Sequence, residues 1–264
     1  MKLALGTAQF GLDYGISNNG GQVALDAVSK ILDFASKNNI TVLDTAQAYG
    51  NSEQVLGKFD LSRFKIVTKM SSESELETSL EKLGVKSVYA LLFHKEIDVN
   101  DETWAKFEKY KKQGKVQKIG VSVYSPEVFK AIMSKYPIDI VQLPLNILDQ
   151  RFLPLLPELK KRNIEIHTRS TFLQGLLLMD TNNVSKFFDS IKPLLAQIPE
   201  PKLDSALGFV KNINEIDSIV VGATSLKEIS EIVSNYNAKM LQKDFSRFSI
   251  VDEQIILPQN WRLT

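Results

Sequence analysis

Residues 44–53, Asp-Thr-Ala-Gln-Ala-Tyr-Gly-Asn-Ser-Glu, place an acid and a tyrosine at the end of a short apolar strand and then begin a helix. The acid is Asp44 and the tyrosine is Tyr49. Polar side chains at the end of a buried strand are typical of a catalytic site in an α/β protein. This stretch therefore predicts where the chemistry of the chain is located.

Two further polar residues end apolar runs in the same way. Lys69 closes the run that begins at Phe64, and His94 closes the run that begins at Val88. Asp44, Lys69 and His94 follow one another at an equal spacing of 25 residues, which is about the size of one strand-helix unit with short connections. If the strands are parallel, all three residues emerge at one edge of the sheet, and Tyr49 can reach the same place from the first loop.

The whole chain alternates short β-branched runs with longer segments of helical period, which predicts a parallel sheet covered by helices. Eight such strands favour a closed (β/α)8 TIM barrel, and 264 residues suit a single domain of this kind, 1–264. The expected strands are Leu3 to Ala8, Thr41 to Asp44, Phe64 to Lys69, Val88 to His94, Lys118 to Ser122, Ile138 to Gln142, Ile164 to Thr168 and Ser218 to Gly222. The expected helices are Gly21 to Asn38, Ser52 to Phe59, Ser72 to Leu83, Asp101 to Gln113, Pro126 to Lys135, Leu153 to Arg162, Lys202 to Asn212 and Leu226 to Asn235.

Two segments lack a clear period. Residues 180–201 are expected to hold one extra short helix, and residues 245–264 form a C-terminal tail. In a barrel this tail either lies across the catalytic mouth or packs on the outer helices, because a chain end must be held down in both cases.

Composition excludes several classes of function. The 32 lysines and arginines nearly balance the 31 aspartates and glutamates, so no global charge favours nucleic acid or an anionic membrane. The absence of cysteine excludes disulfides, thiolate nucleophiles and Cys-based metal sites, and it suits a reducing cytoplasm. No apolar run approaches the roughly 20 residues of a membrane span, and the N-terminus does not resemble a signal peptide. We therefore expect a cytoplasmic protein with a small-molecule substrate; the sequence does not indicate its oligomeric state.

The four residues form a chemically complete set. A tyrosine has an ordinary pKa of about 10, and a nearby ammonium lowers it by favouring the phenolate. We therefore expect Tyr49 to act as general acid or base, Lys69 to tune it, and Asp44 to pair with the lysine. His94 can orient a carbonyl oxygen. Each residue alone has a structural alternative, since a strand-end histidine or a buried Lys-Asp pair can serve the fold only.

Short motifs follow one another in a fixed order along the chain: Asp44-Thr45-Ala46, Tyr49-Gly50, Ser52-Glu53, Leu56-Gly57, Thr68-Lys69, Leu91-Leu92-Phe93-His94, Gly114-Lys115-Val116 and Ile119-Gly120-Val121-Ser122. Their order is similar to that of the aldo-keto reductase superfamily, and the resemblance covers nearly the whole chain. The opening residues 5–11 and the closing residues 258–261 are similar to a bacterial subgroup often associated with surface-polysaccharide gene clusters.

The resemblance implies a barrel that binds NADP(H) or NAD(H) and transfers hydride between the nicotinamide and a small carbonyl or alcohol, possible substrates including a sugar derivative. Tyr49 would protonate the carbonyl oxygen, supported by Asp44, Lys69 and His94. No metal is needed. The chain also lacks a G-x-G-x-x-G segment between a strand and a helix, which agrees with dinucleotide binding without a Rossmann domain.

The same resemblance implies the cofactor contacts. Ser122 and Gln142 match positions that hold the nicotinamide carboxamide, although Val123 replaces the asparagine that usually follows the serine. Arg169 stands where many members place a tyrosine under the nicotinamide ring; a guanidinium can also stack there, and the alternative is an ion pair at the barrel rim. The remaining implied contacts are Gly6, Thr7, Ser170, Gln174 and Gly175, the last two in a turn near the pyrophosphate.

A loop before a helix, Gly222-Ala223-Thr224-Ser225, is expected to cradle a phosphate with its backbone amides. Many members follow it with an arginine that binds the 2′-phosphate of NADP, and Glu228 stands there in this chain. A carboxylate repels a phosphate and accepts from a free ribose hydroxyl, which favours NAD. Lys227 is adjacent and could compensate, so the preference stays open.

Other functions are weighed against this one. His167, the second histidine, could suggest a metal-dependent hydrolase, but no H-x-H or H-E-x-x-H motif accompanies it. A dinucleotide-binding barrel with a regulatory or partner-binding role and little turnover is the second hypothesis, because Val123 and Arg169 leave room for altered use. Candidate pocket aromatics are Phe10, Tyr14, Trp104, Phe152 and Phe172, with Trp104 expected in the core.

Overall fold

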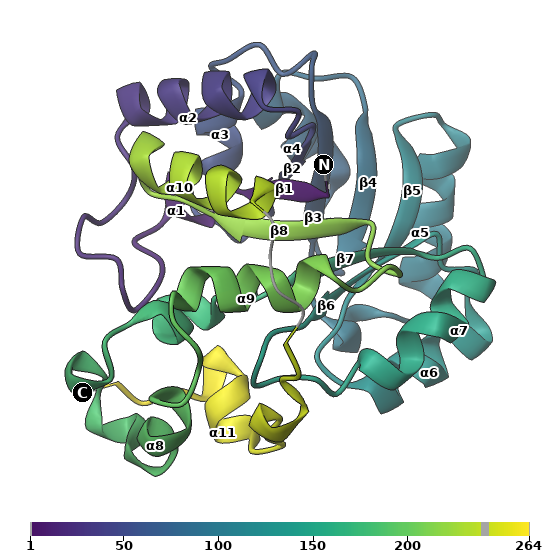
Figure 1. Ribbon diagram of the computed structural model, residues 1–264. Helices are drawn as coiled ribbons and strands as arrows, with labels where there is room; N and C mark the ends of the chain where they lie inside the picture. The colour runs from purple at the N-terminus through teal and green to yellow at the C-terminus, as the bar shows by residue number, and fades with distance from the viewer. Residues whose placement is uncertain (1, 239–242, 264) are drawn as a thin grey trace.

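Eight parallel strands close into a barrel in sequence order, with the last strand paired to the first. Figure 1 shows this computed structural model, which describes residues 2–238 and 243–263. The predicted (β/α)8 barrel is confirmed; Met1 and Thr264, which the predicted domain and tail include, lie outside the described residues. The strands are β1 (Leu3–Gly6), β2 (Val42–Asp44), β3 (Lys65–Met70), β4 (Val88–Phe93), β5 (Val116–Ser122), β6 (Ile140–Pro144), β7 (Glu165–Arg169) and β8 (Ser218–Gly222).

Helices cover the outside of the barrel, and local sequence signals set their ends. Ser125 caps one helix by accepting a hydrogen bond from the amide of Val128, and Pro126 occupies its first turn. Asn100 and Thr103 form a reciprocal capping box on another. The helices are α1 (Ala8–Gly11), α2 (Leu25–Lys37), α3 (Ser52–Leu56), α4 (Leu76–Leu83), α5 (Asp101–Lys112), α6 (Pro126–Lys135), α7 (Leu156–Lys161), α8 (Lys192–Leu195), α9 (Lys202–Lys211), α10 (Leu226–Asn237) and α11 (Glu253–Ile256).

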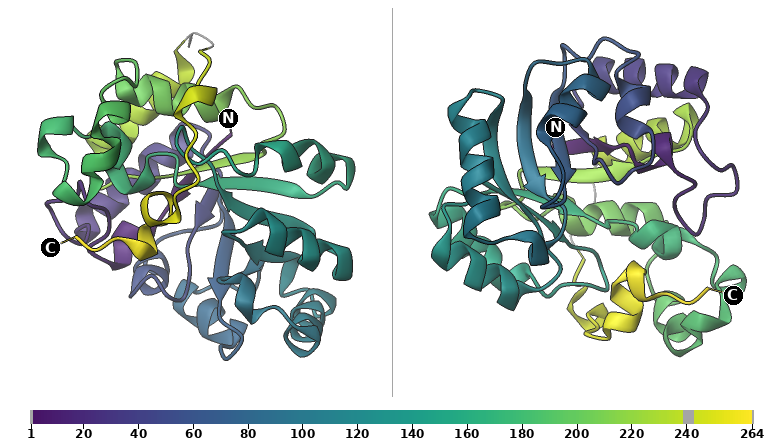
Figure 2. Two further views of the ribbon diagram at one scale, coloured as in Figure 1. Left: turned by 90° about the horizontal axis from the view of Figure 1, so that it is seen from below. Right: turned by 180° about the vertical axis from the view of Figure 1, so that it is seen from behind.

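The core consists of two large apolar clusters and a smaller one. Apolar side chains of the strands pack outward against the helices, while a smaller cluster that includes Ala4, Val67 and Leu92 joins neighbouring strands. A second large cluster joins the loops after β6 and β7 to the C-terminal tail, through residues such as Leu176 and Phe248. Figure 2 shows the tail lying against this part of the molecule in both views. Close packing holds the strands rigidly, and the rigid strands fix the positions of the polar residues at their ends.

The first loop is longer than the sequence suggested. The expected strand to Ala8 ends at Gly6, and Ala8 begins α1. The expected helix from Gly21 begins only at Leu25, because Gly21 has a positive φ of +70° that a helix does not adopt. Residues 12–24, which we call the front loop, therefore project from the barrel, as the purple segment before α2 in Figure 1 shows.

The irregular segments hold several short helical turns in place of one extra helix. Between β7 and α9 the chain forms η3 (Leu173–Leu178), η4 (Thr181–Asn183), η5 (Lys186–Ile191) and α8. The tail combines both of its expected placements. Its apolar residues, including Phe245 and Ile255, are buried against these turns, whereas Pro258 and Gln259 line the large cavity described below.

Candidate active site

The four candidate catalytic residues come together at one edge of the barrel. Asp44 ends β2, Lys69 lies near the end of β3, and His94 follows β4 directly. Tyr49 lies in the loop before α3, and its ring is 5.8 Å from the ring of His94, centroid to centroid, in an edge-on arrangement. The equal spacing along the sequence thus corresponds to three adjacent strands with parallel ends.

Close backbone packing fixes the loop that carries Tyr49. Gly50 has a φ of +56°, and a Cβ at that position would lie 2.2 Å from the carbonyl oxygen of Gly11. A Cβ at Gly11 would in turn lie 1.9 Å from the carbonyl oxygen of Tyr49. Only glycine fits at this contact, so the Tyr49 loop is held against α1 by two adjacent glycine backbones.

Lys69 is the centre of the hydrogen-bond network. Its ammonium donates to Asp44 Oδ2 at 2.7 Å, to the carbonyl oxygen of Thr45 at 2.9 Å and to Tyr49 Oη at 3.3 Å. Both members of the ion pair are almost fully buried, with side-chain exposures of 1% for Lys69 and 3% for Asp44. Because all three N–H groups of the ammonium have acceptors, the lysine is fixed in orientation.

Gln142 completes this arrangement from β6. Its Nε2 donates to Asp44 Oδ1 at 2.6 Å, so each carboxylate oxygen of Asp44 has its own donor. Within residues 2–238 and 243–263, Gln142 Oε1 is a buried oxygen with no hydrogen-bond partner. A buried unpaired acceptor that lines a cavity is suited to receive an N–H group from a ligand.

The protonation state of Tyr49 differs from the sequence-based expectation. Burial, with a further contribution from the Asp44 carboxylate, raises the pKa of Tyr49 well above its usual range. The sequence-based expectation was a lowered pKa; the pKa is raised instead, because desolvation is its largest cause and outweighs the positive charge of Arg169, which acts in the lowering direction. The phenol therefore keeps its proton at neutral pH. Because Lys69 donates to the phenol oxygen, the hydrogen of the phenol itself is directed away from Lys69.

His94 is neutral at physiological pH. Burial lowers its pKa to about 4, and the positive charge of Lys69 acts in the same direction. A neutral imidazole can donate one hydrogen bond to a carbonyl oxygen without adding a charge. This fits the orienting role predicted for His94.

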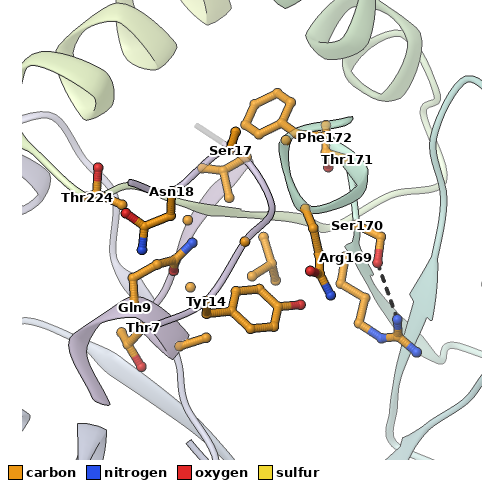
Figure 3. Close-up of a pocket in the computed structure, with 18 of the residues that line it drawn as sticks. Thr7, Gln9, Tyr14, Ser17, Asn18, Arg169, Ser170, Thr171, Phe172 and Thr224 are labelled. Carbon is orange, nitrogen blue, oxygen red and sulfur yellow. Dashed lines mark hydrogen bonds between the residues drawn. The ribbon is translucent and has the colours of Figure 1, made fainter. Parts of the chain in front are cut away.

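A cavity of about 1000 Å³ opens beside these residues. It runs from Tyr49 and His94, past the ends of β5 to β8, to Glu228 and Glu231 on α10. Figure 3 shows part of its wall, where Tyr14 from the front loop points across the cavity toward Arg169. The volume is at the upper end of the range usual for small-molecule sites and suits an extended ligand.

Most of the residues that the resemblance implied for cofactor binding line this cavity. The exceptions are Ala223, which is buried among core residues, and Ser225, whose hydroxyl caps α10 by accepting from the amide of Glu228. Thr7 lines the cavity, but its hydroxyl already donates to the carbonyl of Asp44 and holds β1 beside β2. The lining residues among the implied contacts are Gly6, Thr7, Ser122, Gln142, Arg169, Ser170, Gln174, Gly175, Gly222, Thr224 and Glu228.

The expected phosphate cradle is occupied by a carboxylate of the chain itself. Glu228 Oε2 accepts from the backbone amide of Thr224 at 2.7 Å and from its hydroxyl at 2.9 Å. Glu231, one turn further along α10, also lines the cavity, and its Oε1 lies 3.9 Å from Nζ of Lys227, whose side chain is 84% exposed and does not line the cavity. Among the described residues Glu228 has no cationic partner, so this end of the cavity carries a negative charge.

Arg169 lies at the opposite end of the cavity, near Tyr49 and His94, which we call the reacting end. Its guanidinium stacks on the ring of Tyr124, with 4.0 Å from Cζ to the ring centroid. It donates to the carbonyl oxygen of Val123 at 3.0 Å and to Ser170 Oγ at 3.3 Å. No carboxylate in the described part of the chain pairs with Arg169, so the alternative of an ion pair at the rim is not what the structure shows. One face of the guanidinium is covered by Tyr124.

The front loop provides a part of the cavity wall that no sequence pattern indicated. Ser17, Asn18 and Gln22 of the front loop line the cavity, as does its Tyr14, a candidate aromatic. Gln9 of α1 and Phe172 after β7 line it as well. Phe10 and Phe152 are fully buried, and Trp104 lies in the core as expected. No strand or helix was predicted between Ala8 and Gly21, and nothing in this segment indicated that its side chains line the cavity.

His167 is a core residue. It is fully buried and bonds through Nε2 to Glu165 Oε1 at 2.6 Å. Among the residues described, no group of three His, Asp or Glu side chains is arranged to hold a metal ion. No helix in ranges 2–238 and 243–263 is long and apolar enough to span a bilayer.

Comparisons with known proteins show the family of the chain. The family model described as "Aldo/keto reductase family" matches residues 2–253. An uncharacterized oxidoreductase of Bacillus subtilis is 23% identical over 81% of this chain and 83% of its own length, and L-galactose dehydrogenase of Arabidopsis thaliana is 25% identical over 81% and 79%.

Solved structures show the same fold. An aldo-keto reductase from Bacillus halodurans in its holo form has a TM-score of 0.75 at 20% identity, covering 91% of this chain and 88% of that one. A glycerol dehydrogenase from Gluconobacter oxydans has a TM-score of 0.70 at 20% identity, covering 93% and 89%. The chain belongs to the aldo/keto reductase family, whose members are NAD(P)H-dependent oxidoreductases of small carbonyl compounds.

Proposed function

We propose that the protein reduces a small carbonyl compound with NADH in preference to NADPH, and that Tyr49 is the proton donor. The observation that carries this proposal is the buried network in which Asp44 fixes Lys69 and Lys69 donates to the Tyr49 oxygen. The network joins three strand ends to the wall of a cavity large enough for an extended ligand.

The chain's own residues fit a nicotinamide dinucleotide. The unpaired Gln142 Oε1 can accept from the carboxamide, and Ser122 lies beside it on the neighbouring strand. The carboxylates of Glu228 and Glu231 can accept from ribose hydroxyls at the other end. A dinucleotide bound in this cavity would supply or take up the hydride.

Proton transfer follows from the hydrogen bonds of Tyr49. The phenol is protonated at neutral pH and its oxygen already accepts from Lys69, so its own proton is available to a carbonyl oxygen in the cavity. As the carbonyl oxygen gains negative charge, the phenol donates its proton. The Lys69 ammonium then stabilises the developing phenolate. In alcohol oxidation the same groups act in reverse.

The preference for NADH follows from charge. A 2′-phosphate at the α10 end would meet Glu228, whose carboxylate already holds the amide and hydroxyl of Thr224. Repulsion between the two anions and the loss of these hydrogen bonds both disfavour the phosphate. The Lys227 side chain is exposed and does not line the cavity, and its ammonium lies 3.9 Å from the Glu231 carboxylate, so it is not positioned on Glu228.

A sugar or polyol derivative is the proposed substrate class. Two proteins similar to this chain are an L-galactose dehydrogenase and a glycerol dehydrogenase, and both names refer to polyhydroxy compounds. The resemblance of residues 5–11 and 258–261 to a subgroup linked with surface polysaccharides agrees with this class. The regulatory alternative receives no specific support, because all four catalytic side chains are present and in contact.

Fluorescence titrations with NADH and NADPH, side by side, test the proposal. The expected result is saturable binding of both with a lower Kd for NADH, followed by NADH oxidation in the presence of aldehydes. Binding without turnover over a broad panel of aldehydes and ketones would favour the regulatory hypothesis. A lower Kd for NADPH would contradict the role assigned to Glu228.

A further inference from the structure

We propose that Arg169 makes the protein selective for carbonyl substrates that carry a carboxylate, such as an oxo acid or an acidic sugar derivative. This inference rests on the proposed reductase function and specifies its substrate class. It begins from one observation: Arg169 brings a guanidinium to the wall of the cavity, in the part that also contains Tyr49 and His94.

The guanidinium of Arg169 is held in place, but not all of its N–H groups have hydrogen-bond acceptors. The carbonyl of Val123, the hydroxyl of Ser170 and the ring of Tyr124 fix its position. A guanidinium has five N–H groups, and only these two hydrogen bonds to protein acceptors are present in the described part of the chain. The remaining N–H groups are free to bind a planar anion, and a carboxylate matches their fork geometry.

The charge balance at this end of the cavity is positive. The charges of Asp44 and Lys69 cancel in their ion pair. His94 is neutral and Tyr49 keeps its proton, as described above. Arg169 therefore supplies the one charge that is not balanced among the described groups around the reacting atoms. Arg169 is only partly buried, and its charge attracts a substrate that brings a negative charge to this end of the cavity.

The field of Arg169 reaches the catalytic groups. Burial is the largest cause of the pKa shifts of Tyr49, Lys69 and His94, and the Arg169 charge contributes to all three. The two carboxylates at the α10 end, Glu228 and Glu231, face the same cavity from the opposite side. An anionic substrate is therefore attracted to the reacting end and repelled from the far end, which also directs it to the correct part of the cavity.

The test compares pairs of aldehydes that differ only in charge. One pair is para-carboxybenzaldehyde and para-formylbenzamide, and the other is succinic semialdehyde and its amide. The readout is the ratio of kcat/KM for the acid to kcat/KM for the amide, so that any loss common to both substrates cancels. A charge-assisted hydrogen bond predicts a ratio of roughly tenfold to hundredfold in the wild type, expressed mainly in KM.

Three variants locate the effect. Arg169→Gln removes the charge and is expected to bring the ratio within about threefold of one, whereas Arg169→Lys keeps the charge without the fork and is expected to give an intermediate ratio. Arg63→Gln removes an exposed arginine that does not line the cavity and is expected to leave the ratio unchanged. A wild-type ratio near one, or an acid preference that survives Arg169→Gln, overturns the proposal.

A binding measurement separates this proposal from the proposed function. Calorimetric titration of the protein, saturated with NADH, with benzoate and benzamide requires no turnover. We expect tighter binding of benzoate than of benzamide by the wild type and roughly tenfold weaker benzoate binding by Arg169→Gln. If none of the aldehydes is reduced but benzoate still binds through Arg169, the reductase function fails and the anion site stands. If aldehydes are reduced and benzoate binding does not depend on Arg169, the reductase function stands and the anion site fails.

Discussion

Two parts of the cavity wall are built in different ways. At the reacting end, Asp44, Lys69 and Gln142 project from barrel strands, are almost fully buried and are joined by hydrogen bonds of 2.6 and 2.7 Å. Another part of the wall is formed by the front loop and the loop after β7, which meet where the amide of Ile16 donates to the carbonyl of Gln174. Strands hold the first part and two loops hold the second.

The difference corresponds to two tasks. Proton transfer requires donor and acceptor in fixed positions, which a strand framework provides. Entry and release of a long cofactor require a wall that can open, and a loop contact built on few hydrogen bonds opens at lower free energy than a barrel strand. We therefore expect substitutions at the reacting end to affect stability and chemistry, and substitutions at the loop contact to affect cofactor exchange.

The largest expected effect is that of Lys69→Met. The variant leaves the Asp44 carboxylate buried without its cation, which should lower the free energy of unfolding by about 3–5 kcal/mol and abolish turnover. Chemical denaturation and steady-state kinetics measure the two effects. Lys65→Met, at the exposed start of the same strand, is the matched control and should cost less than about 1 kcal/mol. A Lys69→Met protein as stable as the control would show that the network is not held as described.

Gly175→Ala should weaken the loop contact. A Cβ at this position would lie 1.9 Å from Ser17 Oγ, and the φ of +95° is unfavourable for alanine. Separation of the two loops should speed NADH release by roughly tenfold, in line with the about 1–3 kcal/mol that overpacking costs. Stopped-flow fluorescence gives the rate. Gly21→Ala is the matched control, because Gly21 also has a positive φ, +70°, but a Cβ there would meet nothing within 4 Å. NADH release at the same rate in both variants would argue against the loop contact.

Glu228→Gln should shift the cofactor preference toward NADPH. The substitution removes the negative charge from the α10 end and keeps an oxygen that can accept from Thr224. The ratio of the NADPH Kd to the NADH Kd should fall by about tenfold, which corresponds to roughly 1.4 kcal/mol. Glu231→Gln, on the same wall, should have a smaller effect because Glu231 does not occupy the Thr224 cradle. Equal ratios in Glu228→Gln and wild type would remove the charge explanation.

The smallest expected effect is a pH dependence due to His94. Its folded pKa is about 4 and its ordinary value is 6.5, so the unfolded chain binds more protons between these values. The contribution of neutral His94 is therefore fully present above pH 6.5 and is lost as the pH falls toward 4, with a change on the order of 1 kcal/mol. The free energy of unfolding, measured by chemical denaturation from pH 7 to pH 4, should fall less steeply with decreasing pH for His94→Gln than for the wild type. Identical slopes would mean that His94 titrates as an exposed residue.

The sequence predicted the framework better than the loops. Regular spacing placed Asp44, Lys69 and His94 on adjacent strands because the strand-helix unit repeats with short connections. Residues 21–24 of the front loop were predicted as the start of a helix, because periodicity does not reveal a positive φ, and it does not reveal the contact of the loop with residue 174 either. The sign of the Tyr49 pKa shift also depends on burial, which a sequence pattern does not give. Only the tertiary structure shows that Glu228 occupies its own cradle.

The central claim is that Tyr49, oriented by Lys69, donates the proton to the substrate. The most direct test is single-turnover reduction of an aldehyde by the NADH complex of Tyr49→Phe, with Tyr14→Phe, which changes another tyrosine of the same cavity, as the matched control. We expect the rate to fall by about 10²–10⁴ in Tyr49→Phe, with nearly unchanged NADH affinity, and by less than tenfold in Tyr14→Phe. Reduction at the wild-type rate by Tyr49→Phe would contradict the central claim.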